Sequence, residues 1–207
     1  MSFSPYTSPP LGKRFKEALV WAADLHALQA RKSRRVPYVS HVLGVASLVI
    51  EADGSEDVVI AGLLHDAVED QGGQRTLDRI RRRFGSRVAR LVAEVSEGPP
   101  AEVYTWREKK EAYIRDIRRA SRDARLVATA DKVHNIRTML GALDADGEVV
   151  WTRFGAPKEG TVWFYGAVAR ALGAAGANPL LPALRTEVTR LRQRARLKPR
   201  RRAPSSM

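Results

Sequence analysis

The chain has 207 residues, of which 44% are hydrophobic, and this is enough for one compact domain with a sizeable core. It contains no cysteine, which excludes disulfides and thiolate metal ligands. No apolar run approaches the length of a membrane span, and the first residues lack the layout of a signal peptide. We therefore expect a cytoplasmic protein with no membrane span.

The net charge of +13 is distributed unevenly along the chain. From Arg185 to the end there are nine basic residues and one acid, a net +8, which leaves +5 for the residues before it. The body is therefore mildly basic, which suits a polyanionic small substrate, and the strong basicity belongs to the tail. Weak, nonspecific contact of this tail with RNA or an anionic surface is an open alternative, and the oligomeric state is also left open.

The first part of the chain predicts an irregular segment and three helices. Residues 1–11 hold three prolines and several serines, which predicts an irregular lead-in. Apolar residues at helical spacing predict a first helix over 12–32. Pro37 breaks this pattern, and Ser40 is placed to cap a second helix over 41–52. Ser55, followed by two acids, is placed to cap the helix that carries His65.

The second part predicts further helices and no strands. Thr76 and Ser86 are placed to cap helices that end at Gly85 and near Glu97, and more helices are expected over 106–120, 122–143 and 161–172. A glycine-containing loop is expected over 144–160. The sequence thus predicts an all-α fold, a single compact helical domain of about eight to nine helices. We place this domain at residues 12–180, followed by a basic C-terminal helix over 181–197 and a disordered basic tail over 198–207.

Residues 61–70 begin as an apolar helix and end in polar and acidic positions. His65 and Asp66 are adjacent, and an imidazole beside a carboxylate can ligate one divalent cation. Glu69 stands four residues after His65, one helical turn further along the same face. A carboxylate at that position can take a proton from metal-bound water.

The remaining candidate ligands are histidines and one aspartate. The chain has four histidines, each on or near a helix position that could face a shared pocket: His26, His41, His65 and His134. Asp131 interrupts an apolar helical face, and a buried aspartate is costly unless it is paired or metal-bound. His41, His65, Asp66 and Asp131 would offer two nitrogens and two oxygens, a donor set that suits six-coordinate Mn²⁺, Fe²⁺ or a similar ion.

The order of these residues carries a resemblance to a known family. The chain resembles the HD superfamily of metal-dependent phosphohydrolases, and within it the hydrolase domain of RelA/SpoT-type enzymes and the small alarmone hydrolases. The resemblance runs from about Phe15 to Leu172 and is carried by residues 26–32, 36–41, 64–70 and 130–137. Its most specific parts are Arg31-Lys32 before the first ligand and Glu69-Asp70 after the second.

The resemblance implies a Mn²⁺ enzyme, with one ion per chain, that removes the 3′-diphosphate from (p)ppGpp. It assigns metal ligation to the residues named above, His41, His65, Asp66 and Asp131, and proton handling to Glu69 and Asp70. It also implies that Arg31 and Lys32 hold substrate phosphates and that Asn135 contacts the nucleotide or its ribose.

Other substrate contacts are expected closer to the C-terminus. Arg153 and Lys158 are candidates for second phosphate contacts. Trp163 or Tyr165 could stack on a base, although aromatic residues at helical spacing more often belong to the core. The alternatives are hydrolysis of an adenine alarmone, a deoxynucleotide or NADPH, a nucleic-acid-binding module that uses the basic tail, and a regulatory relative without catalytic activity.

Overall fold

The computed structural model describes residues 11–33, 35–98 and 105–195, and the statements below refer to these ranges. In chain order the helices are α1 (Lys13–Leu25), α2 (Val39–Glu51), α3 (Glu56–Leu64), α4 (Ala67–Asp70), α5 (Gly73–Phe84), α6 (Ser86–Val95), α7 (Trp106–Arg119), α8 (Arg122–Asp146), the 3₁₀ helix η1 (Gly147–Arg153), α9 (Lys158–Ala174) and α10 (Leu181–Arg194). The described residues contain no strand, only an isolated bridge between Ala30 and Pro37. The predicted all-α fold is confirmed.

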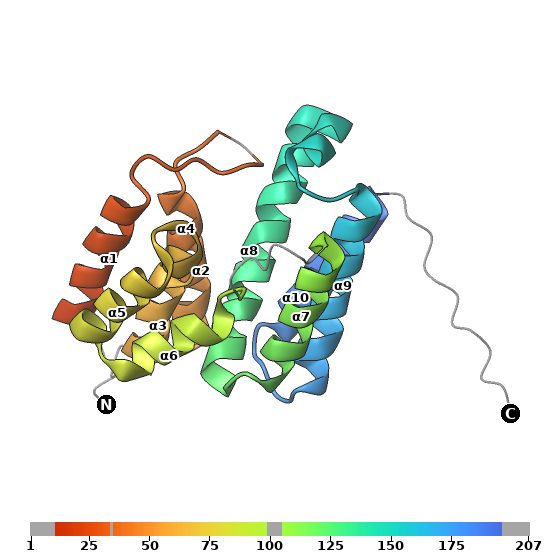
Figure 1. Cartoon of the computed structure of the whole chain (residues 1–207). Coiled ribbons are helices and arrows are strands. Elements are labelled where there is room, and N and C mark those ends of the chain that lie inside the picture. The colour runs from red at the N-terminus through yellow and green to blue at the C-terminus, as the bar shows by residue number, and fades with distance from the viewer. Residues whose placement is uncertain (1–10, 34, 99–104, 196–207) are drawn as a thin grey trace, which may run out of the picture.

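The long helix α8 lies between two groups of helices (Figure 1). On one side it packs against α2, α3 and α6, and on the other against α7, α9, α10 and η1. It can do so because apolar residues occur on several of its faces, and Leu126, Val133, Ile136 and Leu143 are all buried. One continuous core therefore joins both groups, and it includes Leu184 and Leu191 of α10.

The first helix ends seven residues earlier than the sequence predicts, at Leu25 rather than Lys32. The apolar pattern that suggested the longer helix includes Leu28, but Leu28 is fully exposed and packs on nothing. The chain instead forms a loop in which Arg31 N–H donates to the Val36 carbonyl at 3.0 Å and Tyr38 N–H donates to the Gln29 carbonyl at 2.8 Å. The described residues of this loop, 26–33 and 35–38, bring Arg31 and Lys32 toward α8, where Arg31 contacts Asn135.

Several predicted helix starts are also wrong in detail. Ser40 and Ser86 lie within the first turns of their helices and are not the N-cap residues. Thr76 lies in the first turn of α5, where its hydroxyl donates to the Gln71 carbonyl. Ser55 is the N-cap residue of α3, but its side chain makes no capping hydrogen bond. Side-chain caps occur instead at Thr105, which forms a capping box with Glu108, and at Ser121.

The C-terminal part contains more helix than expected. The segment 144–160 holds the last turn of α8, the 3₁₀ helix η1 and the start of α9. Residues 1–10 of the predicted lead-in and the predicted tail at 198–207 lie outside the described residues. Within the part of the chain that the structure describes, no helix combines the length and the apolar character needed to cross a membrane.

Candidate metal centre and substrate cavity

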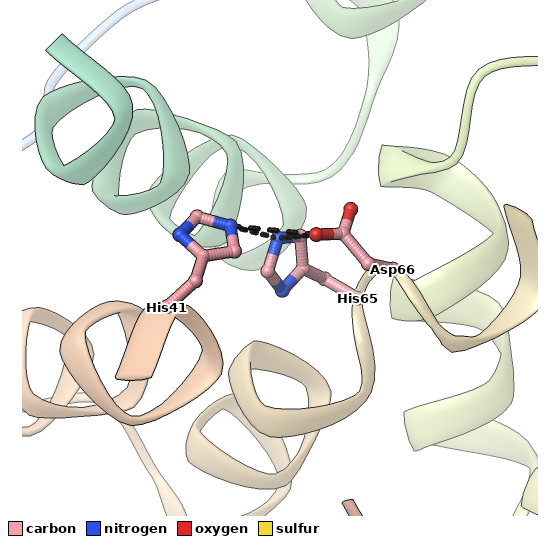
Figure 2. Close-up of side chains that lie close together, drawn as sticks. All are labelled: His41, His65 and Asp66. Atoms are coloured by element: carbon pink, nitrogen blue, oxygen red, sulfur yellow. Dashed lines mark hydrogen bonds and ion pairs between the residues drawn. The ribbon is translucent and has the colours of Figure 1, made fainter. Parts of the chain in front are cut away.

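Four candidate ligands meet where α2, the end of α3 and α8 come together. The ligand atoms of His41, His65 and Asp66 all lie within 4.8 Å of one another (Figure 2). The two Nε2 atoms of His41 and His65 are 3.2 Å apart, and Asp66 Oδ2 lies 3.4 Å and 3.1 Å from them, respectively. Asp131 Oδ1 lies 3.3 Å from His41 Nε2 and 3.7 Å from His65 Nε2. The structure thus brings together all four residues.

The spacing of these atoms fits a divalent cation. Neighbouring ligands at right angles around an ion, with bonds of about 2.1 Å, are separated by about 3.0 Å. The separations between nitrogen and oxygen atoms at this cluster, 3.1 to 3.7 Å, are close to that value. Two imidazole nitrogens and two carboxylate oxygens suit a six-coordinate ion with open positions, and they differ from the sulfur-rich set of a structural zinc site.

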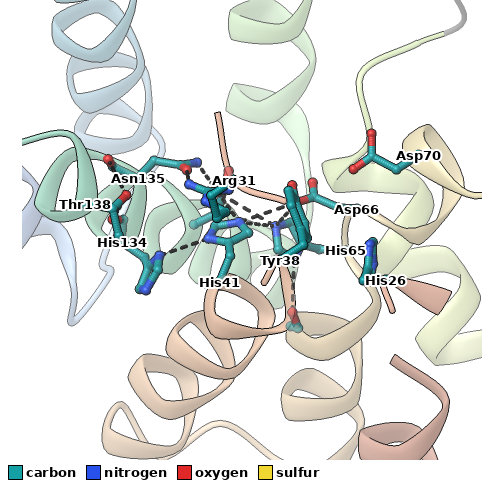
Figure 3. A network of polar contacts seen from close by, with 12 residues as sticks. His26, Arg31, Tyr38, His41, His65, Asp66, Asp70, His134, Asn135 and Thr138 are labelled. Atoms are coloured by element: carbon teal, nitrogen blue, oxygen red, sulfur yellow. Dashed lines mark hydrogen bonds and ion pairs between the residues drawn. The ribbon is translucent and has the colours of Figure 1, made fainter. Parts of the chain in front are cut away.

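Neighbouring groups orient both histidines toward the cluster. His65 Nδ1 donates to the Gly62 carbonyl at 2.9 Å, so Nε2 is the ring nitrogen that faces the cluster. His41 Nδ1 lies 2.9 Å from Nδ1 of His134, which comes from α8 (Figure 3). His134 therefore contacts a candidate ligand without being one, and burial together with His41 lowers its pKa to about 4.

The carboxylates of the cluster are held ionised. Burial opposes the charged form of Asp131, but Lys132 beside it and the two histidines hold its pKa well below the usual value. Burial likewise opposes ionisation of Asp66, and His65 holds the pKa of Asp66 well below its usual value. Two ionised carboxylates beside imidazole nitrogens are what a cation requires.

Two residues that the sequence did not single out support these carboxylates. Lys132 is buried, and its Nζ donates to Asp131 Oδ2 at 2.6 Å. The Tyr38 hydroxyl donates to Asp66 Oδ2 at 2.5 Å. A charged residue inside the apolar pattern of α8 was the available signal for Lys132. No comparable pattern marks Tyr38, because its role depends on the loop between α1 and α2.

A cavity of about 270 Å³ opens beside the cluster. Its lining includes His65, Asp66 and Asp131 together with these predicted site residues: Glu69, Arg31, Lys32, Asn135 and Tyr165. Asn135 links two of them, since it accepts from Arg31 Nη2 at 2.5 Å and donates to Asp131. A second cavity of about 260 Å³ shares Arg31, Lys32, Asn135 and Tyr165 with the first.

The two acids after the His-Asp pair occupy different positions. Helix α3 ends at Leu64 and the chain turns before α4, so Glu69 does not continue the helical face of His65 as predicted. The turn still places Glu69 in the cavity, where its Oε1 accepts the Glu97 N–H at 2.5 Å. Although Glu69 is exposed to the cavity, the surrounding atoms limit its hydration, and this desolvation together with Asp66 raises its pKa to about 7. Asp70 instead lines the second cavity and accepts from Gln29 Nε2 at 2.7 Å.

His26 lies outside the cluster, contrary to the expectation that all four histidines face one pocket. It is buried, its ring stacks on Tyr38 with centroids 4.9 Å apart, and its Nδ1 lies 2.6 Å from Gln29 Oε1. His26 therefore contacts the site only indirectly, because Gln29 donates to Asp70 and Tyr38 donates to Asp66.

The structure brings some of the C-terminal candidates to the site and leaves others outside it. Tyr165 lines both cavities, and Arg153 lines a neighbouring one with Arg31 and Lys32. Lys158 pairs with Glu148 at 2.9 Å, and Trp163 packs against Trp106 under the guanidinium of Arg107. Neither side chain lines these cavities. Lys158 lies at the first residue of α9, beside Glu148, and Trp163 lies on nearly the opposite face of α9 from Tyr165.

Sequence comparison finds related hydrolases. Mouse MESH1, named guanosine-3′,5′-bis(diphosphate) 3′-pyrophosphohydrolase, is 37% identical over 126 residues, which cover 59% of this chain and 68% of MESH1. SpoT of Escherichia coli K12, named bifunctional (p)ppGpp synthase/hydrolase, is 36% identical over 140 residues, which cover 65% of this chain but only 19% of SpoT.

Comparison of structures gives the same relationship. A solved metazoan ortholog of SpoT, described as hydrolysing ppGpp, superposes with a TM-score of 0.69 at 29% sequence identity, over 91% of this chain and 97% of that one. The family described as HD domain matches residues 18–162, a range that includes all four candidate ligands. These findings confirm the resemblance seen in the sequence, and the chain belongs to the HD domain family.

Proposed function

We propose that this protein is a metal-dependent hydrolase that removes the 3′-diphosphate of ppGpp or pppGpp. The observation that carries the proposal is the cluster of His41, His65, Asp66 and Asp131 at the wall of a cavity that also holds Glu69 and the Arg31-Lys32 pair. Relatives named for this reaction are similar to the chain over the range that contains these residues.

The four clustered residues hold one divalent ion, which we propose to be Mn²⁺, with Fe²⁺ or another divalent ion as the alternative. A cation bound there supplies Lewis-acid activation of a phosphoryl oxygen and of water. The sequence and the spacing of the donor atoms support a six-coordinate ion of this kind, since oxygen and imidazole donors suit Mn²⁺ and Fe²⁺.

The other residues of the cavity handle the proton and the charge. Glu69 takes a proton from the water that attacks phosphorus, and the bond between phosphorus and the 3′ oxygen breaks. The leaving 3′ oxygen takes up a proton from solvent, and Glu69 releases its own proton to solvent, which restores the carboxylate. Arg31 and Lys32 neutralise the diphosphate, while Asn135 holds Arg31 in place and contacts the nucleotide. Asp70 orients the loop through Gln29, and Tyr165 forms part of the wall against which the nucleoside lies.

Release of pyrophosphate from a panel of nucleotides tests the proposal. With Mn²⁺ present, we expect turnover of ppGpp to exceed that of an adenine alarmone, a deoxynucleoside triphosphate and NADPH. Asp131→Asn serves as the inactive control, because it keeps the shape of the side chain but removes its charge. Robust turnover of another nucleotide with none of ppGpp would contradict the substrate and leave the reaction class in place.

A further inference from the structure

A third cavity, which is basic, lies next to the cavity of about 270 Å³ beside the candidate metal cluster, called the metal cavity below. It has a volume of about 710 Å³ and lies between the loop that joins α1 to α2 and the C-terminal end of α8 with η1. Figure 1 shows this loop reaching across the top of the molecule toward α8. Arg31 and Lys32 line both this cavity and the metal cavity, so the two spaces are joined along these side chains.

The two cavities differ in their balance of charge. The metal cavity is lined by four basic side chains and four acidic ones, so the formal charges of its lining sum to zero before a metal ion or substrate binds. The charged residues that line the basic cavity are Arg31, Lys32, Arg35 and Arg153, against the single acid Asp146. Among the described residues, no ion pair is formed by Lys32 or Arg35, so their charges are available to a ligand.

The walls of this basic cavity are built before a ligand arrives. Arg153 donates to the Ser33 carbonyl and to Asp146 Oδ2, both at 2.7 Å, which ties the loop to the end of α8. Arg31 is held by Asn135 at 2.5 Å and lies over the Tyr38 ring at 5.2 Å from its centroid. A preorganised set of guanidinium groups is well suited to a phosphate group.

We propose that this cavity binds a second phosphoryl group of the substrate, the one on the 5′ side of the nucleoside, while the 3′-diphosphate lies at the metal cluster. The proposal rests on the proposed function and extends it. It makes Arg35 a specificity-determining residue, because Arg35 lines the basic cavity and does not line the metal cavity. The enzyme then prefers nucleotides that carry phosphate at both ends of the ribose.

The experiment measures kcat/KM on two nucleotides for the wild type and for variants of Arg35. The wild type and Arg35→Ala are assayed on guanosine 3′,5′-bis(diphosphate) and on guanosine 3′-diphosphate with a free 5′ hydroxyl. We expect the ratio of kcat/KM for the first over the second to fall roughly tenfold in Arg35→Ala, the scale of one charge-assisted hydrogen bond. The change should lie in KM, and Arg35→Lys should restore part of it.

Arg82→Ala is the matched control, because Arg82 is an exposed arginine on α5 that lines none of these cavities. It should leave the ratio unchanged. An unchanged ratio in Arg35→Ala, with both nucleotides turned over, overturns the inference and leaves the proposed function standing. Absence of pyrophosphate release from both nucleotides by the wild type overturns the proposed function and this inference with it.

Discussion

Each of the four candidate metal ligands is held in place by a partner residue, and in the two histidines this partner leaves Nε2 facing the cluster. His65 is fixed by the Gly62 carbonyl and His41 by His134, while Asp66 and Asp131 are fixed by Tyr38 and Lys132. Such partners set the tautomer and direction of a ligand, and their removal typically changes metal affinity by about 10- to 100-fold.

Removal of a ligand should remove the metal. We expect His65→Ala and Asp131→Ala to lower the bound divalent ion from about one per chain to near zero, because the site then lacks a donor. Elemental analysis of the purified proteins measures this, with circular dichroism to check that the variants stay folded. Lys158→Ala is the control, since its side chain pairs with Glu148 outside the cavity. Full occupancy in both ligand variants would show that the assignment is wrong.

Protonation of Glu69 should determine how kcat/KM falls at low pH. The pKa of Glu69 is raised to about 7, so the carboxylate form that accepts a proton predominates only above that pH. We expect kcat/KM to fall as the pH drops below about 7, and Glu69→Gln to lose roughly 100-fold or more in turnover while it keeps its metal.

The pH dependence separates a base from a structural role. In Glu69→Gln the residual rate should no longer show this acid limb, whereas in Asp70→Asn the limb should persist, because Asp70 lines the second cavity. A Glu69→Gln enzyme with wild-type turnover would mean that this side chain only anchors the Glu97 backbone.

How far the sequence predicts the site depends on the residue. The type and order of His41, His65-Asp66 and Asp131 were enough to propose one cluster, and the structure brings them together. Lys132 was missed although its charge interrupts the apolar pattern of α8, because a lysine is usually solvent-exposed and only the packing shows that this one is buried. From the sequence, Lys158 and Trp163 could not be told apart from Arg153 and Tyr165, because the tertiary packing of η1 and α9 decides which side chains reach the cavities.

Among the elements, helix existence could be predicted and helix ends could not. The apolar spacing located most of the helices, since each needs a face to bury. The same spacing extended the first helix past Leu25, because Leu28 fits the pattern but finds no core partner. It also missed the break after Leu64, which is a backbone turn and has no apolar signature.

Close packing of α2 on α8 suggests a substitution that acts on the metal without touching a ligand. A methyl group built on Gly44 of α2 would overlap the ring of His134, which contacts His41. We expect Gly44→Ala to displace that ring and to lower metal affinity by about 10- to 100-fold, measured by titration with Mn²⁺. Overpacking of this kind should also reduce the free energy of unfolding by about 1–3 kcal/mol.

Gly141→Ala provides the matched control on the other helix. Gly141 lies in α8, and a methyl group there would meet nothing within 4 Å. This change should leave metal affinity unchanged and raise stability by roughly 0.5–1 kcal/mol, because alanine is the better helix former. Equal metal affinity in both glycine variants would show that His134 does not position His41.

At the scale of the whole molecule, α8 connects the metal cavity with the basic cavity. Its middle contributes Asp131, Lys132 and Asn135 to the metal cavity, and its end contributes Asp146 to the basic cavity. The loop with Arg31 and Lys32 closes both from the opposite side. This arrangement arises from tertiary packing between segments far apart in the sequence, such as those of Arg31 and Asn135, and local sequence patterns do not encode it.

The basic tail should affect nonspecific binding and leave catalysis unchanged. Residues 198–207 carry four positive charges, Lys198, Arg200, Arg201 and Arg202, and no candidate ligand, base or substrate-binding residue lies among them. Cutting the chain after Leu197 should therefore leave kcat and metal content unchanged on a small nucleotide. Binding to single-stranded RNA should weaken, and the slope of log K against log salt should become shallower by about 0.7 for each phosphate that the shortened protein no longer neutralises.

A full-length variant with these four residues changed to glutamine should match the truncation, because the effect depends on charge and not on length. Loss of turnover in the truncated protein would show instead that the tail reaches the active site, in its own subunit or in a neighbouring one.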